Sequence, residues 1–204
     1  MYTLYFLPDA CSLAIHSILN ELELPLELVH RQDAVDFERL NPAVTVPVLT
    51  RDDQVLNEGV AIVMLLMEQH DNQLLPRSGA LRQRALENML FANASMHPAY
   101  GRLFFIDSAI TDPIARQQAF VAAVVQINAL WQAVETRLQG QPYLGGEQIS
   151  PADFFLAVYS RWGAAFPVEI EVGAHARGMI ERVLERDSVQ LAIQREQEYC
   201  AYVR

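Results

Sequence analysis

Lysine is absent from this 204-residue chain, so all 15 of its basic residues are arginine. The 25 acidic residues outnumber them and give a formal net charge of −10. Most of the imbalance lies near the N-terminus, where the first 76 residues hold three arginines and 12 acidic residues. Because such a surface repels polyanions, we expect no nucleic acid partner.

Apolar runs are short, the N-terminus does not resemble a secretion signal, and cysteines are few. No apolar run reaches the roughly 18 residues of a membrane span, and the N-terminus lacks the basic start and apolar stretch of a signal peptide. The two cysteines, Cys11 and Cys200, have neither CxxC spacing nor a disulfide framework, which fits a reducing compartment. We therefore expect a cytoplasmic protein without a membrane partner.

Several motifs of known chemistry are missing. The chain has no glycine-rich phosphate loop, no HExxH or GxSxG sequence, and no Cys/His cluster with metal-ligand spacing. We therefore expect no metal.

The hydrophobic pattern predicts two domains. Strand, helix, strand, helix, hairpin and helix follow one another in the first domain, over about 3–7, 11–22, 26–30, 35–40, 46–57 and 58–69. A helix between its first two strands predicts that they pair in parallel. Only helical patterns follow, over about 80–107, 113–138, 151–165, 173–185 and 188–200. The sequence thus predicts an α/β domain over residues 1–76 and an all-helical domain over 77–204.

Cys11 lies where the first strand ends and the first helix begins. Free backbone N–H groups and the helix dipole stabilise an anion there, so the pKa of a thiol at this position can fall and make it nucleophilic. The acidic surroundings act in the opposite direction. The alternative is a small buried cysteine without chemistry.

Two further positions could bind a ligand through the backbone. Val46-Pro47 precedes a strand, and a cis bond there would turn the backbone groups of Val46 outward for an extended peptide. Glu58-Gly59 begins the next helix, where N–H groups bind a carboxylate and Glu58 an ammonium group. An ordinary trans proline and plain helix capping are the alternatives.

Two aromatic side chains of the helical domain are candidates as well. His97 lies in the middle of a predicted helix and could donate a hydrogen bond, or it could be a satisfied core histidine. Trp162 stands among aromatic neighbours and could line a ligand pocket or belong to the core.

The order of these parts resembles the cytosolic glutathione S-transferases, and the bacterial beta class most. The matching segments are Pro8–Ala14, Asn41-Pro42, Val46–Leu49, Glu58–Ile62, Met96-His97, Tyr143–Gly145, Ile149–Asp153 and Arg161-Trp162. They extend over nearly the whole chain, and the series as a whole carries the resemblance.

The resemblance implies a thioredoxin-like N-terminal domain that binds glutathione, an all-helical C-terminal domain that lines a hydrophobic pocket, and a homodimer. Carried over by position, Cys11 is expected to contact the glutathione sulfur, with the Ser12 hydroxyl as a weaker alternative and His97 nearby. Val46 and Pro47 are expected to contact the tripeptide backbone, and Glu58 and Gly59 the γ-glutamyl end. Trp162 is expected to contact the hydrophobic co-substrate.

The implied function is detoxification by conjugation of glutathione, as co-substrate, to small hydrophobic electrophiles. Two alternatives stay open: a glutathione-dependent thiol–disulfide reductase that uses Cys11, and a non-catalytic binding or regulatory protein of the same fold. One departure concerns affinity. Relatives often carry a basic residue after the second strand, whereas this chain has Gln32-Asp33-Ala34. We therefore expect either weaker glutathione binding than is usual in the family or a modified thiol as the ligand.

Overall fold

The computed structural model describes residues 1–202, which form two compact units. One unit comprises residues 1–73 together with the segment from Val183 onward, and the other is Leu74–Arg182. The first boundary lies close to the predicted end of the N-terminal domain at residue 76. The predicted helical domain differs at its end, because the last helix packs against the first helix of the N-terminal unit.

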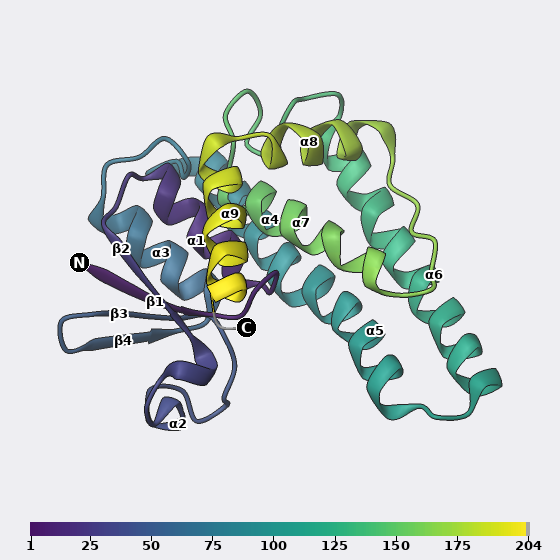
Figure 1. The fold of residues 1–204 in the computed structure, drawn as a ribbon. Helices are drawn as coiled ribbons and strands as arrows, with labels where there is room; N and C mark the ends of the chain where they lie inside the picture. The colour runs from purple at the N-terminus through teal and green to yellow at the C-terminus, as the bar shows by residue number, and fades with distance from the viewer. Residues whose placement is uncertain (203–204) are drawn as a thin grey trace. The chain divides into compact units, whose positions relative to one another are not determined.

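A four-stranded sheet organises the N-terminal unit, in the order β2-β1-β3-β4. Its strands are β1 (Tyr2–Phe6), β2 (Leu26–His30), β3 (Val48–Arg51) and β4 (Gln54–Asn57). The pair β1 and β2 is parallel, as the intervening helix predicts, and the other two pairs are antiparallel (Figure 1). Alternate residues of β1 are buried, which is the pattern of a strand with one face on the core.

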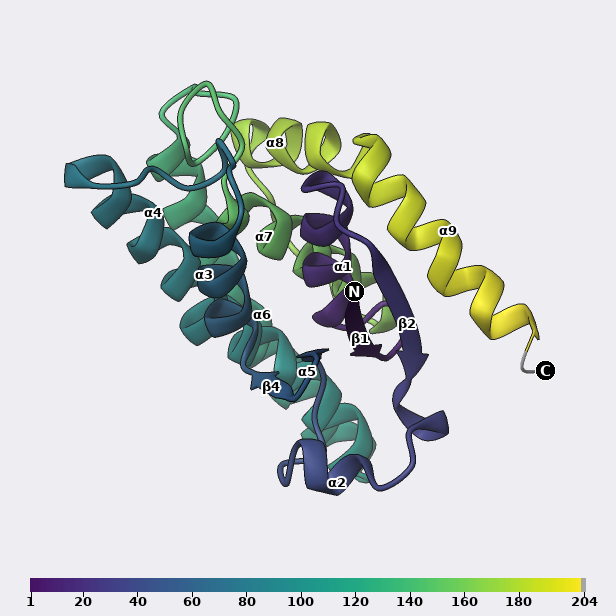
Figure 2. The same cartoon turned by 90° about the vertical axis from the view of Figure 1, so that its left-hand side faces the viewer.

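Helices pack against this sheet and against one another. The helices of the unit are α1 (Ser12–Glu21), α2 (Phe37–Leu40), α3 (Gly59–Gln69) and α9 (Asp187–Tyr202). Apolar side chains of α1 recur at helical spacing and are fully buried, among them Leu13, Ile15 and Ile18. The long helix α9 packs against α1, and Figure 2 shows it running from the end of α8 toward the C-terminus.

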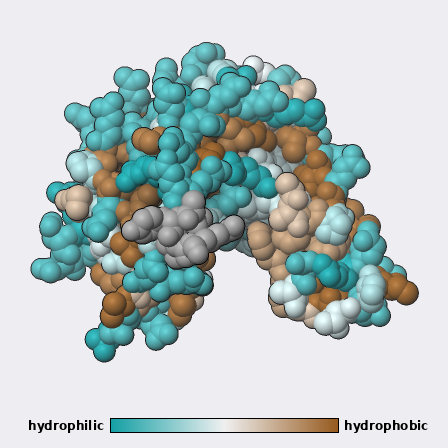
Figure 3. All heavy atoms as spheres, in the orientation of Figure 1, coloured by the Kyte–Doolittle hydropathy of each residue, from teal (hydrophilic) through white to brown (hydrophobic). Residues whose placement is uncertain are grey.

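The second unit is helical throughout its described elements. They are α4 (Gly79–Phe91), a π-helical segment (Ala92–Met96), α5 (His97–Ala109), α6 (Pro113–Leu138), α7 (Pro151–Arg161), a 3-10 turn (Trp162–Ala165) and α8 (Ala174–Leu184). One face of α8 is apolar and buried through Ala176, Met179 and Val183. Its outer surface is hydrophilic in Figure 3, so the helix is amphipathic.

The prediction of one helix over 80–107 was wrong in its middle. The structure inserts the π-helical segment between α4 and α5. Pro98 explains the interruption, because it has no N–H to donate to the preceding turn and its ring crowds the carbonyl four residues earlier. His97 therefore stands at the start of α5 instead of in the middle of a helix.

Asp153 anchors the start of α7 as a buried carboxylate. It accepts hydrogen bonds from the backbone N–H groups of Leu144 (2.9 Å) and Ser150 (2.8 Å) and from the Ser150 hydroxyl (2.7 Å). Burial is the largest influence and raises the pKa of Asp153 to about 6, although these hydrogen bonds lower it. The reciprocal hydrogen bonds of Ser150 and Asp153 form a capping box at the start of α7.

No helix within residues 1–202 combines the length and the apolarity needed to cross a membrane.

The Asp153→Asn variant should reveal the proton held by this carboxyl. Its pKa is about 6 in the folded chain and roughly 3.9 in an unfolded one, so folding favours the protonated form between these values. The stability of the wild type relative to the variant should therefore fall by about 2 kcal/mol as the pH rises from 4 to 7. Urea denaturation at several pH values measures this. Parallel pH profiles of the two proteins would contradict it.

Candidate active site

The Cys11 thiol lies in the turn that joins β1 to α1. Cys11 is half-buried and immediately precedes the first helical residue, Ser12. Its thiol donates to the carbonyl oxygen of Val46, with 3.2 Å between Sγ and O. Two positions singled out in the sequence, 35 residues apart, are thus in direct contact.

Burial determines the charge of this thiol. Desolvation is the largest cause that, together with the nearby Glu58 carboxylate, raises the pKa of Cys11 to about 11. The backbone N–H groups of Cys11 and Ser12 act in the opposite direction and are outweighed. The lowering of the thiol pKa that a helix terminus can produce is therefore outweighed by burial, and the Cys11 thiol is a neutral S–H group at pH 7.

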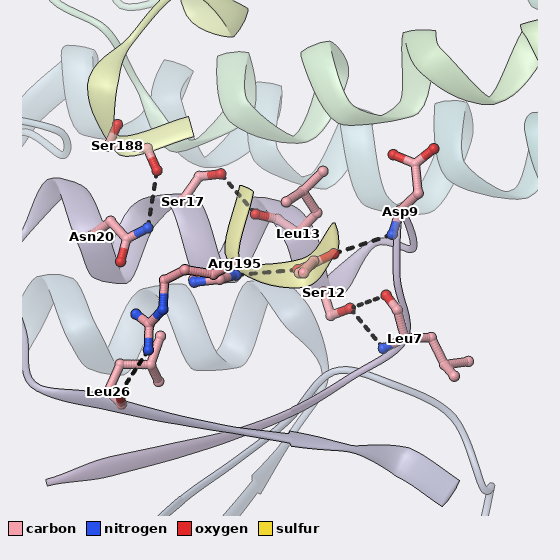
Figure 4. Close-up of polar contacts among 11 residues, drawn as sticks. Leu7, Asp9, Ser12, Leu13, Ser17, Asn20, Leu26, Ser188 and Arg195 are labelled. Atoms are coloured by element: carbon pink, nitrogen blue, oxygen red, sulfur yellow. Dashed lines mark hydrogen bonds and ion pairs between the residues drawn. The ribbon is translucent and has the colours of Figure 1, made fainter. Parts of the chain in front are cut away.

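The Ser12 hydroxyl is used within the turn. The side chain is fully buried, its Oγ donates to the Leu7 carbonyl at 3.2 Å, and the Leu7 N–H donates back to Oγ at 3.3 Å (Figure 4). A further hydrogen bond, from the Ala10 N–H to the Leu7 carbonyl, closes the same turn. These contacts favour a role for Ser12 in holding the turn over contact with a ligand.

A tight loop presents Val46. The Val46-Pro47 peptide bond is cis, and Val46 is half-buried while Pro47 is buried. The buried Asn41 holds the loop, because its amide donates to the Thr45 carbonyl at 2.8 Å and its side-chain oxygen accepts from the Ala43 N–H at 3.1 Å. Sequence analysis noted Asn41 only as part of a motif and missed this function.

Glu58 stands just before α3 with its side chain exposed, whereas Gly59 is buried. The φ angle of Glu58 is +71°, a conformation that ordinary L residues rarely adopt and that costs of order 1–3 kcal/mol. Asn57 next to it donates to the Leu40 carbonyl at 3.1 Å. The exposed carboxylate therefore projects from a strained but fixed position beside the first N–H groups of α3.

His97 and Trp162 come together in the helical unit. The His97 ring meets Tyr159 and Trp162 edge-on, with centroid distances of 5.1 and 5.2 Å. Trp162 is buried and also contacts Tyr100 and Phe104. Trp162 thus belongs to an aromatic cluster of the core, while His97 is half-buried at the edge of this cluster.

The segment after β2 carries the acidic residue Asp33. Asp33 accepts a hydrogen bond from the Tyr199 hydroxyl of α9. The nearby Arg31 donates to the Val44 carbonyl at 2.9 Å. The negative Asp33 carboxylate cannot supply the positive charge that the resemblance leads one to expect after β2. Arg31 is positively charged, but it is already hydrogen-bonded to the loop before Val46.

Over the described residues, no group of three or more His, Cys, Asp or Glu side chains is arranged to hold a metal ion. The side chain of Cys200 lies outside the described part of the chain.

The structure thus brings Cys11, Ser12, Val46 and Glu58 to one region of the N-terminal unit, and His97 with Trp162 to one region of the helical unit. Sequence analysis also missed Glu196, whose buried carboxylate accepts from the Asp9 N–H two residues before the thiol. No local pattern could have found it, because the partners are 187 residues apart.

Ser12→Ala should destabilise the protein, because it removes the hydroxyl that bonds to both backbone groups of Leu7. We expect a loss of about 1–3 kcal/mol in the free energy of unfolding, measured by urea denaturation. Ser108→Ala is the matched control, since that hydroxyl is exposed and bonds only within its own helix, and its effect should stay within about 0.5 kcal/mol. Equal effects of the two substitutions would refute the assigned role.

Comparison with known proteins agrees with this arrangement. Residues 11–74 match the glutathione S-transferase N-terminal domain, and residues 96–186 match the C-terminal domain of the same family. The glutathione S-transferase GST-4.5 of Xanthomonas campestris pv. campestris is 32% identical over 199 residues, which cover 95% of this chain and 98% of that protein.

Solved structures are similar over nearly the whole chain. The glutathione S-transferase of Xylella fastidiosa superposes with a TM-score of 0.86 at 27% identity, covering 97% of this chain and 99% of the other. The beta-class enzyme of Sphingomonas chungbukensis gives 0.82 at 27% identity, with 95% and 98% covered. The predicted fold class, a thioredoxin-like α/β domain followed by an all-helical domain, is confirmed. The chain belongs to the glutathione S-transferase family.

Proposed function

We propose that this protein conjugates glutathione to small hydrophobic electrophiles and that Cys11 donates a hydrogen bond to the glutathione sulfur. The observation that carries the proposal is the contact at the start of α1 between the Cys11 Sγ and the Val46 carbonyl oxygen, 3.2 Å apart, in which the thiol is the donor. At a pKa of about 11, only about 10⁻⁴ of this thiol is ionised at pH 7. A neutral thiol is a hydrogen-bond donor and a poor nucleophile.

In the proposed reaction, the glutathione sulfur is the nucleophile. Its thiol proton passes to solvent, its lone pair forms a bond to the electrophilic carbon, and the leaving group departs with the electron pair of the broken bond. The Cys11 S–H stabilises the thiolate form of glutathione by donating to its negative sulfur. Cys11 therefore forms no covalent bond in this cycle.

Val46 and Glu58 hold the rest of the tripeptide. The backbone N–H and carbonyl of Val46 pair with the glutathione backbone as an added strand would. A peptide N–H that takes over the Val46 carbonyl displaces the Cys11 thiol from it and frees the S–H for the ligand sulfur. The exposed Glu58 carboxylate attracts the γ-glutamyl ammonium group, and the first N–H groups of α3 beside buried Gly59 receive the γ-glutamyl carboxylate.

The aromatic cluster around Trp162 supports an apolar co-substrate. His97 and Phe104 stand at its edge, and Phe104 is 47% exposed. Such rings favour flat or aromatic molecules through edge and stacking contacts. Trp162 then acts by supporting these rings from the core.

A thiol–disulfide reductase is the second candidate, because the backbone N–H groups of Cys11 and Ser12 do favour a thiolate. In that reaction, the Cys11 thiolate attacks a sulfur of a glutathione-containing disulfide and expels the other thiol. A second glutathione thiolate then attacks the mixed disulfide and forms oxidised glutathione, while Cys11 regains its proton.

A non-catalytic binding protein is the third candidate, supported by the acid at Asp33. We further propose a cytoplasmic homodimer, as is typical of the family. Light scattering of the purified protein tests the dimer, and a monomer would contradict it.

Cys11 substitutions separate the three candidates. A hydroxyl replaces the thiol as a donor, so Cys11→Ser should conjugate a chromogenic aryl halide within about threefold of wild type, whereas Cys11→Ala should lose about 10–100-fold in kcat/KM. Loss of disulfide reduction in both variants, with a glutathione adduct on wild-type Cys11 by intact mass spectrometry, would favour the reductase. Absence of glutathione binding by calorimetry would leave only the binding protein.

Glu58→Gln tests the γ-glutamyl site. Calorimetry should give a wild-type Kd for glutathione above the low micromolar range, because the N-terminal unit offers the tripeptide little positive charge. The variant should bind about tenfold more weakly, a loss of roughly 1.4 kcal/mol. Asp52→Asn removes one charge from the β3–β4 turn of the same unit and should leave Kd unchanged. Low micromolar wild-type affinity, or equal effects of both substitutions, would count against this site.

A further inference from the structure

One edge of the sheet gathers the ends of all four strands. The parallel strands β1 and β2 both end there, at Phe6 and His30, which pair in register. Because β3 runs antiparallel to β1, it begins at this edge with Val48, and β4 ends there at Asn57, the residue opposite Val48. The segments just beyond these strand ends therefore meet along a single edge.

The strand order fixes the sequence of groups along this edge. In the order β2-β1-β3-β4, Asp33 follows β2, Cys11 follows β1, Val46 precedes β3, and Glu58 follows β4. The row thus begins and ends with a carboxylate, and both carboxylate residues are exposed. Its middle holds the thiol and the backbone of Val46, which are in direct contact.

The length of this row matches a thiol peptide. Neighbouring strands lie about 4.8 Å apart, so the three spacings from β2 to β4 cover roughly 14 Å. An extended tripeptide covers roughly 10 Å, and the longer glutamyl side-chain linkage of glutathione adds to that span. With its γ-glutamyl end at Glu58 and its thiol at Cys11, such a ligand extends its C-terminal end toward Asp33.

Asp33 is an anion at that end of the row. It accepts a hydrogen bond from the Tyr199 hydroxyl, which raises the pKa of Tyr199, so the phenol keeps its proton and Asp33 keeps the charge. A carboxylate accepts up to about four hydrogen bonds, which leaves Asp33 with capacity for a ligand donor. Arg31 stands two residues earlier, but its guanidinium donates to the Val44 carbonyl at 2.9 Å, and Asp33 offsets its charge.

Charge at this end selects among C-terminal groups. A free carboxylate beside Asp33 meets a like charge, whereas an amide or ester avoids that repulsion and an ammonium group turns it into attraction. The surroundings act in the same direction, because the first 76 residues hold three arginines and 12 acidic residues. Both ends of the row therefore favour ligand groups that are neutral or positive.

We propose that the thiol substrate of this protein is a γ-glutamyl-cysteinyl peptide whose C-terminal carboxylate is masked, and that an amide carrying a second ammonium group is preferred. Glu58 receives the ammonium group at one end of the ligand and Asp33 the group at the other, while the thiol between them faces Cys11. This inference rests on the proposed function, because it names the class of thiol bound at the same site.

Calorimetry with three thiols tests the preference. The probes are glutathione, its glycyl ethyl ester, and its glycyl amide with 1,3-diaminopropane, which carry net charges of about −1, 0 and +1 at pH 7. At low salt, the ester should bind several-fold and the diamine amide at least tenfold more tightly than glutathione. These differences should shrink in about 0.5 M salt, because salt screens exposed charges.

Two matched variants assign the preference to one residue. Asp33→Asn keeps an oxygen that accepts from Tyr199 and removes the charge, so the advantage of the diamine amide over glutathione should fall several-fold. Asp36→Asn changes an exposed carboxylate three residues further on, which pairs with Arg39 at 3.3 Å, and should leave that advantage unchanged. Equal effects of the two substitutions would refute the role of Asp33.

Failure of this inference is distinguishable from failure of the proposed function. Tighter binding of glutathione than of both derivatives would overturn the inference alone, because the contacts of Cys11, Val46 and Glu58 do not involve the C-terminal group. Absence of binding of all three thiols would overturn both.

Kinetics provide a second measurement. In aryl halide conjugation, the diamine amide should lower KM for the thiol and leave kcat within about twofold of its value with glutathione, because the masked group is remote from the reacting sulfur and binds equally in the ground and transition states. An unchanged or higher KM for the thiol would contradict the proposed preference.

Discussion

The turn between β1 and α1 is the constraint on which the site depends. A parallel strand must end, reverse and enter a helix within five residues, and the chain does so by bonding both backbone groups of Leu7 to the Ser12 hydroxyl. This closure places Cys11 against the loop that carries Val46. The dominant energy at the thiol is then desolvation, which exceeds the pull of the helix N-terminus.

Acidic charge shapes the same unit in two ways. Glu58 opposes ionisation of the Cys11 thiol, and Asp33, a second acidic residue, accepts a hydrogen bond from Tyr199. Under the proposed function, a tripeptide with two carboxylates would therefore be held mainly by backbone donors. The aromatic cluster around Trp162 would attract an apolar co-substrate irrespective of charge.

Local periodicity was enough to predict most of the elements, and long-range packing explains what it missed. The alternation in β1 and the helical spacing in α6 are properties of neighbouring residues, so both could be located from sequence. Burial of Cys11 depends on Val46, and the anchoring of Asp9 depends on Glu196, at separations of 35 and 187 residues. The residues of the candidate site could thus be named from motifs, whereas the protonation of the thiol and its support from α9 could not.

A thiol that remains protonated is also oxidised slowly. Peroxides attack the thiolate form of cysteine, and susceptibility to sulfenic acid formation follows thiolate character and access. The Cys11 thiol donates to the Val46 carbonyl and is largely protonated, so little thiolate is available to such oxidants. We therefore expect peroxides to oxidise the Cys11 sulfur slowly.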